Sequence, residues 1–171
     1  GASMINDVSA LTHDPVLGRL AAESGLPICL MHAQGTPATM QADPRYDDVL
    51  LDVYDFLEER LAAAGAMGIP RAGLIADPGI GFGKTLEHNL TLIRGLSLFH
   101  GLGVPILLGA SRKRFIGTIA DEPQADRRDP GSMAVTLAGV AQGIHIHRVH
   151  DTEGTRQALC LWQAVQGGVT T

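Results

Sequence analysis

The sequence predicts an α/β fold with a parallel sheet, and three observations lead to this prediction. Short apolar runs of strand length alternate five times with stretches of helical periodicity, which is typical of βα units. The runs are rich in Ile, Leu, Val and Met, as expected for strands that are buried on both faces. The connections between the units are short. A sheet built in this way is either an open doubly wound sheet or a barrel.

The expected elements follow one another in a regular order. The strands are expected at residues 2–6, 27–32, 73–77, 105–109 and 144–150, and the helices at 14–24, 43–65, 86–99, 132–142 and 152–165. Pro15 occupies a first-turn position of the first helix, and Gly25 follows its end. Apolar residues from Val49 to Leu61 recur at helical spacing in the second helix. The charged segment 121–131 contains two prolines and is expected to be an exposed loop.

Composition limits the classes of partner. Hydrophobic residues make up 45% of the 171 residues and charged residues 18%, so a folded core is expected rather than disorder. The net charge of −5 argues against nucleic acid or an anionic membrane surface as the main partner, although a local cationic pocket stays open. No apolar run reaches the ~18 residues that span a bilayer. Cys29 and Cys160 are predicted to be buried thiols in the reducing cytoplasm.

Every expected strand ends in polar residues. Parallel α/β folds bind ligands at the carboxyl ends of their strands. A single polar strand end is more often the cap of the next helix, but five together favour a binding site. In chain order the polar ends are Asn6-Asp7, His32, Asp77, Ser111-Arg112-Lys113, and Arg148 with His150.

The glycine-rich segment 77–85 does not fit a nucleotide-binding motif. Pro78 stands where a phosphate loop needs its first glycine, and Lys84 stands where a dinucleotide fingerprint needs its third. The glycines allow the backbone to approach a flat ligand closely, with Phe82 as a lid. A plain glycine-rich turn is the alternative.

Two groups of cations suggest anion sites. Arg112, Lys113 and Arg114 open a predicted helix, the end at which cations do not stabilise a helix. We expect this uncompensated positive helix start to bind an anion, with a solvated charge run as the alternative. Arg148 and His150 share one strand face and suit a phosphate or a planar ring.

A catalytic metal held by the protein is not expected. His145 and His147 face away from His150 in a strand, and no Glu or Cys completes a ligand set. Asp77 can instead accept two N–H bonds from a cyclic guanidine-like edge. With the amide of Asn6 and the two anion sites, this carboxylate points to a pterin or purine that carries phosphate.

These residues resemble the dihydropteroate synthase family from end to end. The segments that match are 1–7, 29–32 with Gly35, 46–49, 77–84, 111–113 and 148–151. The resemblance implies a (β/α)8 TIM barrel and a sulfonamide-sensitive step of folate biosynthesis. In that step 6-hydroxymethyl-7,8-dihydropterin pyrophosphate and 4-aminobenzoate condense to 7,8-dihydropteroate and pyrophosphate.

The resemblance also assigns roles to residues. Asn6 and Asp77 would hydrogen bond the pterin ring and Lys113 its carbonyl side, while Arg148 would stack near the ring and hold the pyrophosphate together with His150. Met31, Gly81 and Phe82 would line the pterin pocket. The 4-aminobenzoate would lie against Phe82, Lys113 and Arg114. Lys113, Asp77 and Arg148 would be the catalytic residues. Arg114 stands where the family commonly has Ser, so the carboxylate contact would come from Arg114 or from backbone amides.

Magnesium is implied as a cofactor, bound through the substrate's pyrophosphate and an Asn on the family's first strand. That strand has no counterpart here, so no metal ligand is expected within this chain. Five βα units are fewer than the eight of a barrel, which typically needs ~250 residues. We therefore expect residues 1–171 to form one pterin-binding domain with strands 4–8 of the barrel, incomplete at its N-terminus and inactive in isolation. A cytoplasmic homodimer is expected.

Two other functions stay open at this point. One is a pterin-binding barrel of the methyltransferase type, although the anion sites at 111–113 and 148–150 favour pyrophosphate chemistry. The other is a non-catalytic fragment that binds a pterin or dimerises.

Overall fold

Five parallel strands form the centre of the described part of the protein. The computed structural model describes residues 1–35 and 44–167. Strands β1 (Ile5–Asp7), β2 (Ile28–Met31) and β3 (Leu74–Asp77) form one sheet, and β4 (Leu107–Leu108) pairs with β5 (Ile146–His147) in a second. All of these pairs are parallel, and a parallel bridge from Ala76 to Ile106 joins the two sheets. The strands thus lie in chain order, which confirms the predicted α/β class.

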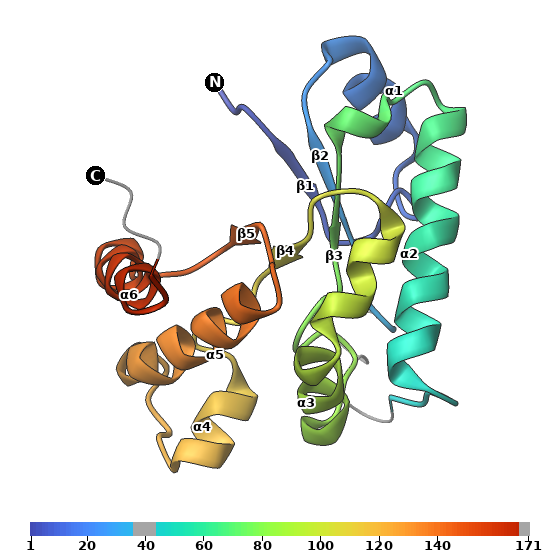
Figure 1. Cartoon of the computed structure of the whole chain (residues 1–171). Coiled ribbons are helices and arrows are strands. Elements are labelled where there is room, and N and C mark those ends of the chain that lie inside the picture. The colour runs from blue at the N-terminus through green and yellow to red at the C-terminus, as the bar shows by residue number, and fades with distance from the viewer. Residues whose placement is uncertain (36–43, 168–171) are drawn as a thin grey trace.

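Helices accompany both sheets. They are α1 (Pro15–Ser24), α2 (Val49–Ala66), α3 (Leu86–Arg94), α4 (Arg114–Ala120), α5 (Asp129–Ala141) and α6 (Thr152–Val165), with 3-10 turns at Arg71–Gly73, Leu96–Leu102 and Ala125–Arg127. Helix α2 lies along the β1–β3 sheet and α3 lies beyond the end of β3, whereas α4, α5 and α6 gather beside β4 and β5 (Figure 1). Within residues 1–35 and 44–167, no helix has the length and apolar character needed to cross a membrane.

Side-chain caps set where four of the helices begin. Asp14 accepts the N–H of Val16 before α1, and Asp48 accepts two N–H groups at the start of α2. Thr85 and His88 form a reciprocal capping box at α3, and Asp151 accepts an N–H of α6. Each cap satisfies a backbone donor that has no partner within its own helix.

The main core lies between the β1–β3 sheet and its helices. Strand β2 contributes Ile28 and Leu30, α2 contributes Val53 and Leu57, and the turn after α3 contributes Phe99, all with 0% exposure. The buried positions of α2 recur at the predicted helical spacing. This packing fixes the carboxyl ends of the strands, where the polar residues stand.

Several predicted boundaries were wrong. The last two strands are shorter than expected, since β4 covers only Leu107–Leu108 of 105–109 and β5 only Ile146–His147 of 144–150, so Arg148 and His150 follow the strand. Helix α2 begins at Val49 because Asp48 caps it, and position 43 lies outside the described residues. Helix α3 ends at Arg94, since the chain continues from Gly95 in a 3-10 turn. The segment 121–131 is loop only in part, because a 3-10 turn covers Ala125–Arg127 and α5 begins at Asp129, with Pro130 in its first turn.

The prediction for the two cysteines was half right. Cys29 is buried in β2, whereas Cys160 is exposed on α6. Helix α6 buries only Thr155 among its residues, so a helical apolar pattern there did not imply burial of the thiol.

Core packing by α2 can be tested with two leucines on the same helix. We expect Leu57→Ala to lower the free energy of unfolding by about 2–5 kcal/mol, because it leaves a cavity at a fully buried position. Leu51→Ala is the control, since Leu51 is 51% exposed and its loss should change stability by less than about 0.5 kcal/mol. Urea unfolding followed by circular dichroism measures both. Equal effects of the two substitutions would contradict the packing described here.

Candidate active site

The centre of the candidate site is the carboxylate of Asp77, the last residue of β3. Its side chain is 1% exposed. Oδ1 accepts the N–H of Gly79 at 2.8 Å. Oδ2 is buried and has no hydrogen-bond partner within the described residues. Because buried polar atoms are rarely left without a partner, this oxygen is a natural acceptor for a donor from a ligand.

Three cations surround this carboxylate. Burial raises the pKa of Asp77, and this is opposed by the N–H of Gly79 and then by the positive charges of Arg148, Lys84 and Lys113. Arg148 Nη2 lies 3.7 Å from Asp77 Oδ2. The three cations follow three different strands, so the strand ends bring together charges that are far apart in the sequence.

Arg148 connects the first and the last strand. Its Nη1 donates to Asn6 Oδ1 at 3.1 Å, so Asn6, Asp77 and Arg148 form one contiguous group. The guanidinium lies against Gly109, where a Cβ atom would be 2.7 Å from Nη2. The missing side chain at position 109 therefore makes room for Arg148. The Arg148 side chain stays 44% exposed, which leaves its charge open to a ligand.

A small cavity of about 210 Å³ lies beside Arg148. It is lined by Gly109, Ser111, Lys113, Arg148, Val149 and His150. The Ser111 hydroxyl lies 2.9 Å from His150 Nδ1 and accepts the N–H of His150 at 3.2 Å. This bond holds the chain after β4 against the chain after β5. Two cations and an imidazole thus face one small space, which suits a phosphate group.

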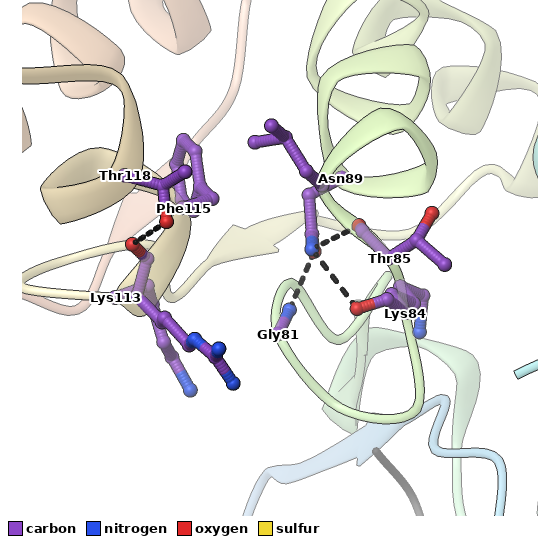
Figure 2. A pocket seen from close by; sticks show the side chains of 9 residues that line it. Gly81, Lys84, Thr85, Asn89, Lys113, Phe115 and Thr118 are labelled. Atoms are coloured by element: carbon purple, nitrogen blue, oxygen red, sulfur yellow. Dashed lines mark hydrogen bonds between the residues drawn. The ribbon is translucent and has the colours of Figure 1, made fainter. Parts of the chain in front are cut away.

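The loop 78–84 is held close to the chain that follows β2. Gly79 has φ +70°, and a Cβ there would lie 1.8 Å from the carbonyl oxygen of His32. Only glycine fits this position. From α3, Asn89 accepts the N–H of Gly81 at 2.6 Å and donates to the carbonyl of Thr85 at 2.6 Å (Figure 2). Sequence reasoning missed Asn89, because a lone Asn near a helix start resembles a surface residue.

Lys84 and His32 form a second feature that sequence reasoning did not identify as a pair. Lys84 is 3% exposed, and its Nζ lies 2.8 Å from His32 Nδ1 and 3.1 Å from the carbonyl oxygen of Phe82. Burial, and then the charge of Lys84, lower the pKa of His32 to about 3, so its neutral ring accepts from Lys84. Burial is also the main cause that lowers the pKa of Lys84 to about 7.

A larger cavity of about 470 Å³ opens between the start of α3 and the start of α4. Its lining consists of Gly81, Lys84, Thr85, Leu86, Asn89, Lys113, Arg114, Phe115 and Thr118. Figure 2 shows Lys113 and Phe115 on one side and Gly81 and Asn89 on the other. Lys113 Nζ lies 4.0 Å from the centroid of the Phe82 ring, a cation–π contact. Lys113 lines both cavities and so links them.

The structure distributes the predicted site residues over three neighbouring places. Arg148 contacts both Asn6 and Asp77, His150 lies in the small cavity, and Arg114 lies in the large one. Gly81 and Phe82 face Lys113. Met31, which was predicted to line the pterin pocket, pairs in register with Asp77, is completely buried and lines neither cavity. Asp7 turns away into a local turn, where it accepts bonds from Ser9 and Leu11.

One expectation about the cations was wrong. The start of α4 is not an uncompensated charge run, because Arg112 pairs in a bidentate manner with Asp129, at 2.8 Å and 2.7 Å. Arg112 lines neither cavity. Within the described residues, no three His, Cys, Asp or Glu side chains cluster to hold a metal ion.

Comparison with known proteins identifies one family. The family model described as "Pterin binding enzyme" matches residues 1–150. The chain is 45% identical to the dihydropteroate synthase of Neisseria meningitidis serogroup C over 166 residues, which cover 96% of this chain and 59% of that protein. The chain therefore spans about three-fifths of the length of this curated relative.

Solved structures agree with this comparison. The crystal structure of dihydropteroate synthase from Stenotrophomonas maltophilia superimposes with a TM-score of 0.93 and 45% identity, covering 99% of this chain and 64% of that one. The dihydropteroate synthase from Xanthomonas albilineans in complex with 7,8-dihydropteroate gives a TM-score of 0.89 and 43% identity, covering 97% and 60%.

The buried Lys84 makes a testable contribution to the pH dependence of stability. Its pKa of about 7 in the folded protein lies below the ordinary 10.5, so the folded protein binds fewer protons than the unfolded chain between these values. The free energy of unfolding should therefore rise with pH across this window, by at most about 1.4 kcal/mol per pH unit.

Lys84→Met removes this contribution. Urea unfolding at pH 6.5, 8 and 9.5 should give a stability difference, wild type minus variant, that moves in favour of the wild type as pH rises. Parallel pH profiles for the two proteins would contradict the assignment.

Proposed function

The chain belongs to the pterin-binding enzyme family, and from this premise we propose that it carries the pterin and anion sites of a dihydropteroate synthase. The reaction condenses 6-hydroxymethyl-7,8-dihydropterin pyrophosphate with 4-aminobenzoate to 7,8-dihydropteroate and pyrophosphate. The observation that supports this proposal most strongly is the buried, unpartnered oxygen of Asp77 with Arg148 beside it. A purely structural carboxylate would be fully hydrogen bonded.

The pterin would bind at the group formed by Asn6, Asp77 and Arg148. The ring presents a guanidine-like edge with adjacent N–H donors, and Asp77 Oδ2 accepts from it. The Asn6 amide and the Lys113 ammonium meet the remaining polar atoms of the ring, while Gly81 and Phe82 cover its face. Asp77 can do this because its own loop occupies only Oδ1.

The pyrophosphate would occupy the small cavity at Arg148 and His150. Charge builds up on the leaving oxygen as the bond between the pterin methylene carbon and that oxygen breaks, and the cations of the cavity stabilise it. The bonding electron pair leaves with the pyrophosphate. The aniline nitrogen of 4-aminobenzoate then forms the new C–N bond at the methylene and loses a proton. The protein supplies orientation and charge and no covalent nucleophile.

The 4-aminobenzoate would enter through the large cavity, which shares Lys113 with the small one. Phe82 offers its ring as an apolar wall. Arg114 is exposed on the rim of this cavity, where its guanidinium can pair with the benzoate carboxylate.

The remaining features of this proposal concern the whole molecule. Residues 1–171 would form one pterin-binding domain that supplies strands 4–8 of a (β/α)8 barrel, supported by the chain-ordered parallel strands. Magnesium would accompany the pyrophosphate. The described residues include no cluster of His, Cys, Asp or Glu that would hold it.

The proposal also covers the assembly and the location of the protein. A homodimer would use α5 and α6, where Leu161 and Val165 are 67% and 74% exposed. A cytoplasmic location would agree with the two free cysteines.

Calorimetric titration with the pterin pyrophosphate tests this function. The protein should bind it, and Arg148→Ala should weaken binding about tenfold or more, because charge-assisted bonds to phosphate are lost. In a complete barrel that contains this chain, Lys113→Ala should lower turnover by about two orders of magnitude with an unchanged circular dichroism spectrum. Arg156→Ala, at an exposed position of α6, is the control and should behave as the wild type. Wild-type affinity in Arg148→Ala would exclude the proposed anion site.

A further inference from the structure

Arg112 directs its polar groups into the start of α5. Its guanidinium donates to both carboxylate oxygens of Asp129, and its backbone N–H donates to Ser132 Oγ at 2.9 Å. Its carbonyl oxygen accepts from Arg128 Nη1 at 3.1 Å. Three residues near the start of one helix thus hold the backbone and the side chain of a single loop residue.

This loop residue has an unfavourable backbone conformation. Arg112 has φ +57°, one of four non-glycine residues with positive φ in the described ranges. Such a conformation is unfavourable for an L-residue and persists only where the surroundings enforce it. The four hydrogen bonds to α5 are the interactions that enforce it here.

Asp129, Ser132 and Arg128, here called the Arg112 clamp, are themselves held in place. Arg128 also donates to the carbonyl oxygens of Glu122 and Pro123, at 2.9 Å and 2.6 Å, and Ser132 Oγ donates to the carbonyl of Arg128 at 2.8 Å. On the other side of the turn, Ser111 is bonded to His150. The turn 111–113 is therefore fixed between α5 and the end of β5.

The next residue is Lys113. Arg112 is held by α5, whereas Lys113 lies over the Phe82 ring and against Gly81. Arg112 at φ +57° and Lys113 at φ −63° follow each other in one turn. In this turn the backbone bonds of Arg112 to Ser132 and Arg128 occur together with the contact of Lys113 with Phe82.

We propose that Arg112 is a positioning residue: clamped by Asp129, Ser132 and Arg128, it holds the left-handed turn that places the Lys113 ammonium over Phe82. Its importance for turnover rests on the proposed function, whereas the placement of Lys113 does not. Arg112 itself contacts neither cavity, so it acts through Lys113 and not on a ligand.

The protein suits a direct measurement of this placement. Lys84 and Lys113 are the two lysines in the sequence, so isotope-labelled lysine gives two side-chain signals in an NMR spectrum. The aromatic ring current of Phe82 should shift the Hε protons of Lys113 upfield. Lys84, on the other side of the site, serves as an internal reference.

The variants separate the clamp from the turn. Arg112→Ala and Asp129→Asn should each lose the upfield shift of Lys113 in this chain. In a complete barrel that contains this chain, each should lower kcat/KM about 100-fold, as for a misplaced catalytic group. Arg112→Gly makes the left-handed conformation accessible without the clamp, so its shift should lie between those of the wild type and Arg112→Ala. Arg127→Ala is the matched control: it breaks the nearby ion pair with Glu122 at 3.1 Å and should change neither readout.

The result that would overturn the proposal is a wild-type Lys113 shift in Arg112→Ala. If circular dichroism shows that Arg112→Ala does not fold, the nearly isosteric Asp129→Asn decides by the same criterion. A wild-type protein that does not bind the pterin pyrophosphate would refute the proposed function, while the NMR comparison would still decide whether Arg112 positions Lys113.

Discussion

The arrangement of the site depends on the burial of one carboxylate. Asp77 lies at the end of β3 with almost no exposure, and burial raises its pKa. An ionised carboxylate in such a place needs nearby positive charge and hydrogen bonds. Gly79 supplies one bond, and Arg148, Lys84 and Lys113 supply the charge, yet Oδ2 has no donor among residues 1–35 and 44–167. Under the proposed function, a ligand that brings N–H groups would complete this geometry.

Two loops must be rigid for these charges to converge. The loop 78–84 is held by the glycine contact with His32, by Asn89 and by the buried Lys84. The turn 111–113 is held by the Arg112 clamp and by the bond between Ser111 and His150. Both are held by buried or partly buried polar contacts from neighbouring elements. Lys113 contacts Phe82 where the two loops face each other. The two loops together therefore fix the position of Lys113, the residue that lines both cavities.

Sequence patterns predicted the parallel α/β class, the five strands and the polar strand ends, because burial on both faces and the period of a helix leave direct marks on the chain. They failed where tertiary contacts decide. Arg112 looks like an anion ligand until Asp129, 17 residues later, is seen to neutralise it. Asn89 and the pair of Lys84 with His32 carry no local signal. Cys160 lies in an apolar stretch, yet its helix is largely exposed.

The most direct test of this account is the affinity of Asp77→Asn for the pterin pyrophosphate, measured together with its free energy of unfolding at pH 7. Because the pKa of Asp77 is raised, its ionised carboxylate is unfavourable for the folded protein at pH values above that pKa. A free energy of unfolding close to that of the wild type shows that the variant is folded. Binding should weaken by about tenfold to 100-fold, since a charged acceptor is lost. Undiminished affinity in a stably folded variant would contradict the central role of Asp77.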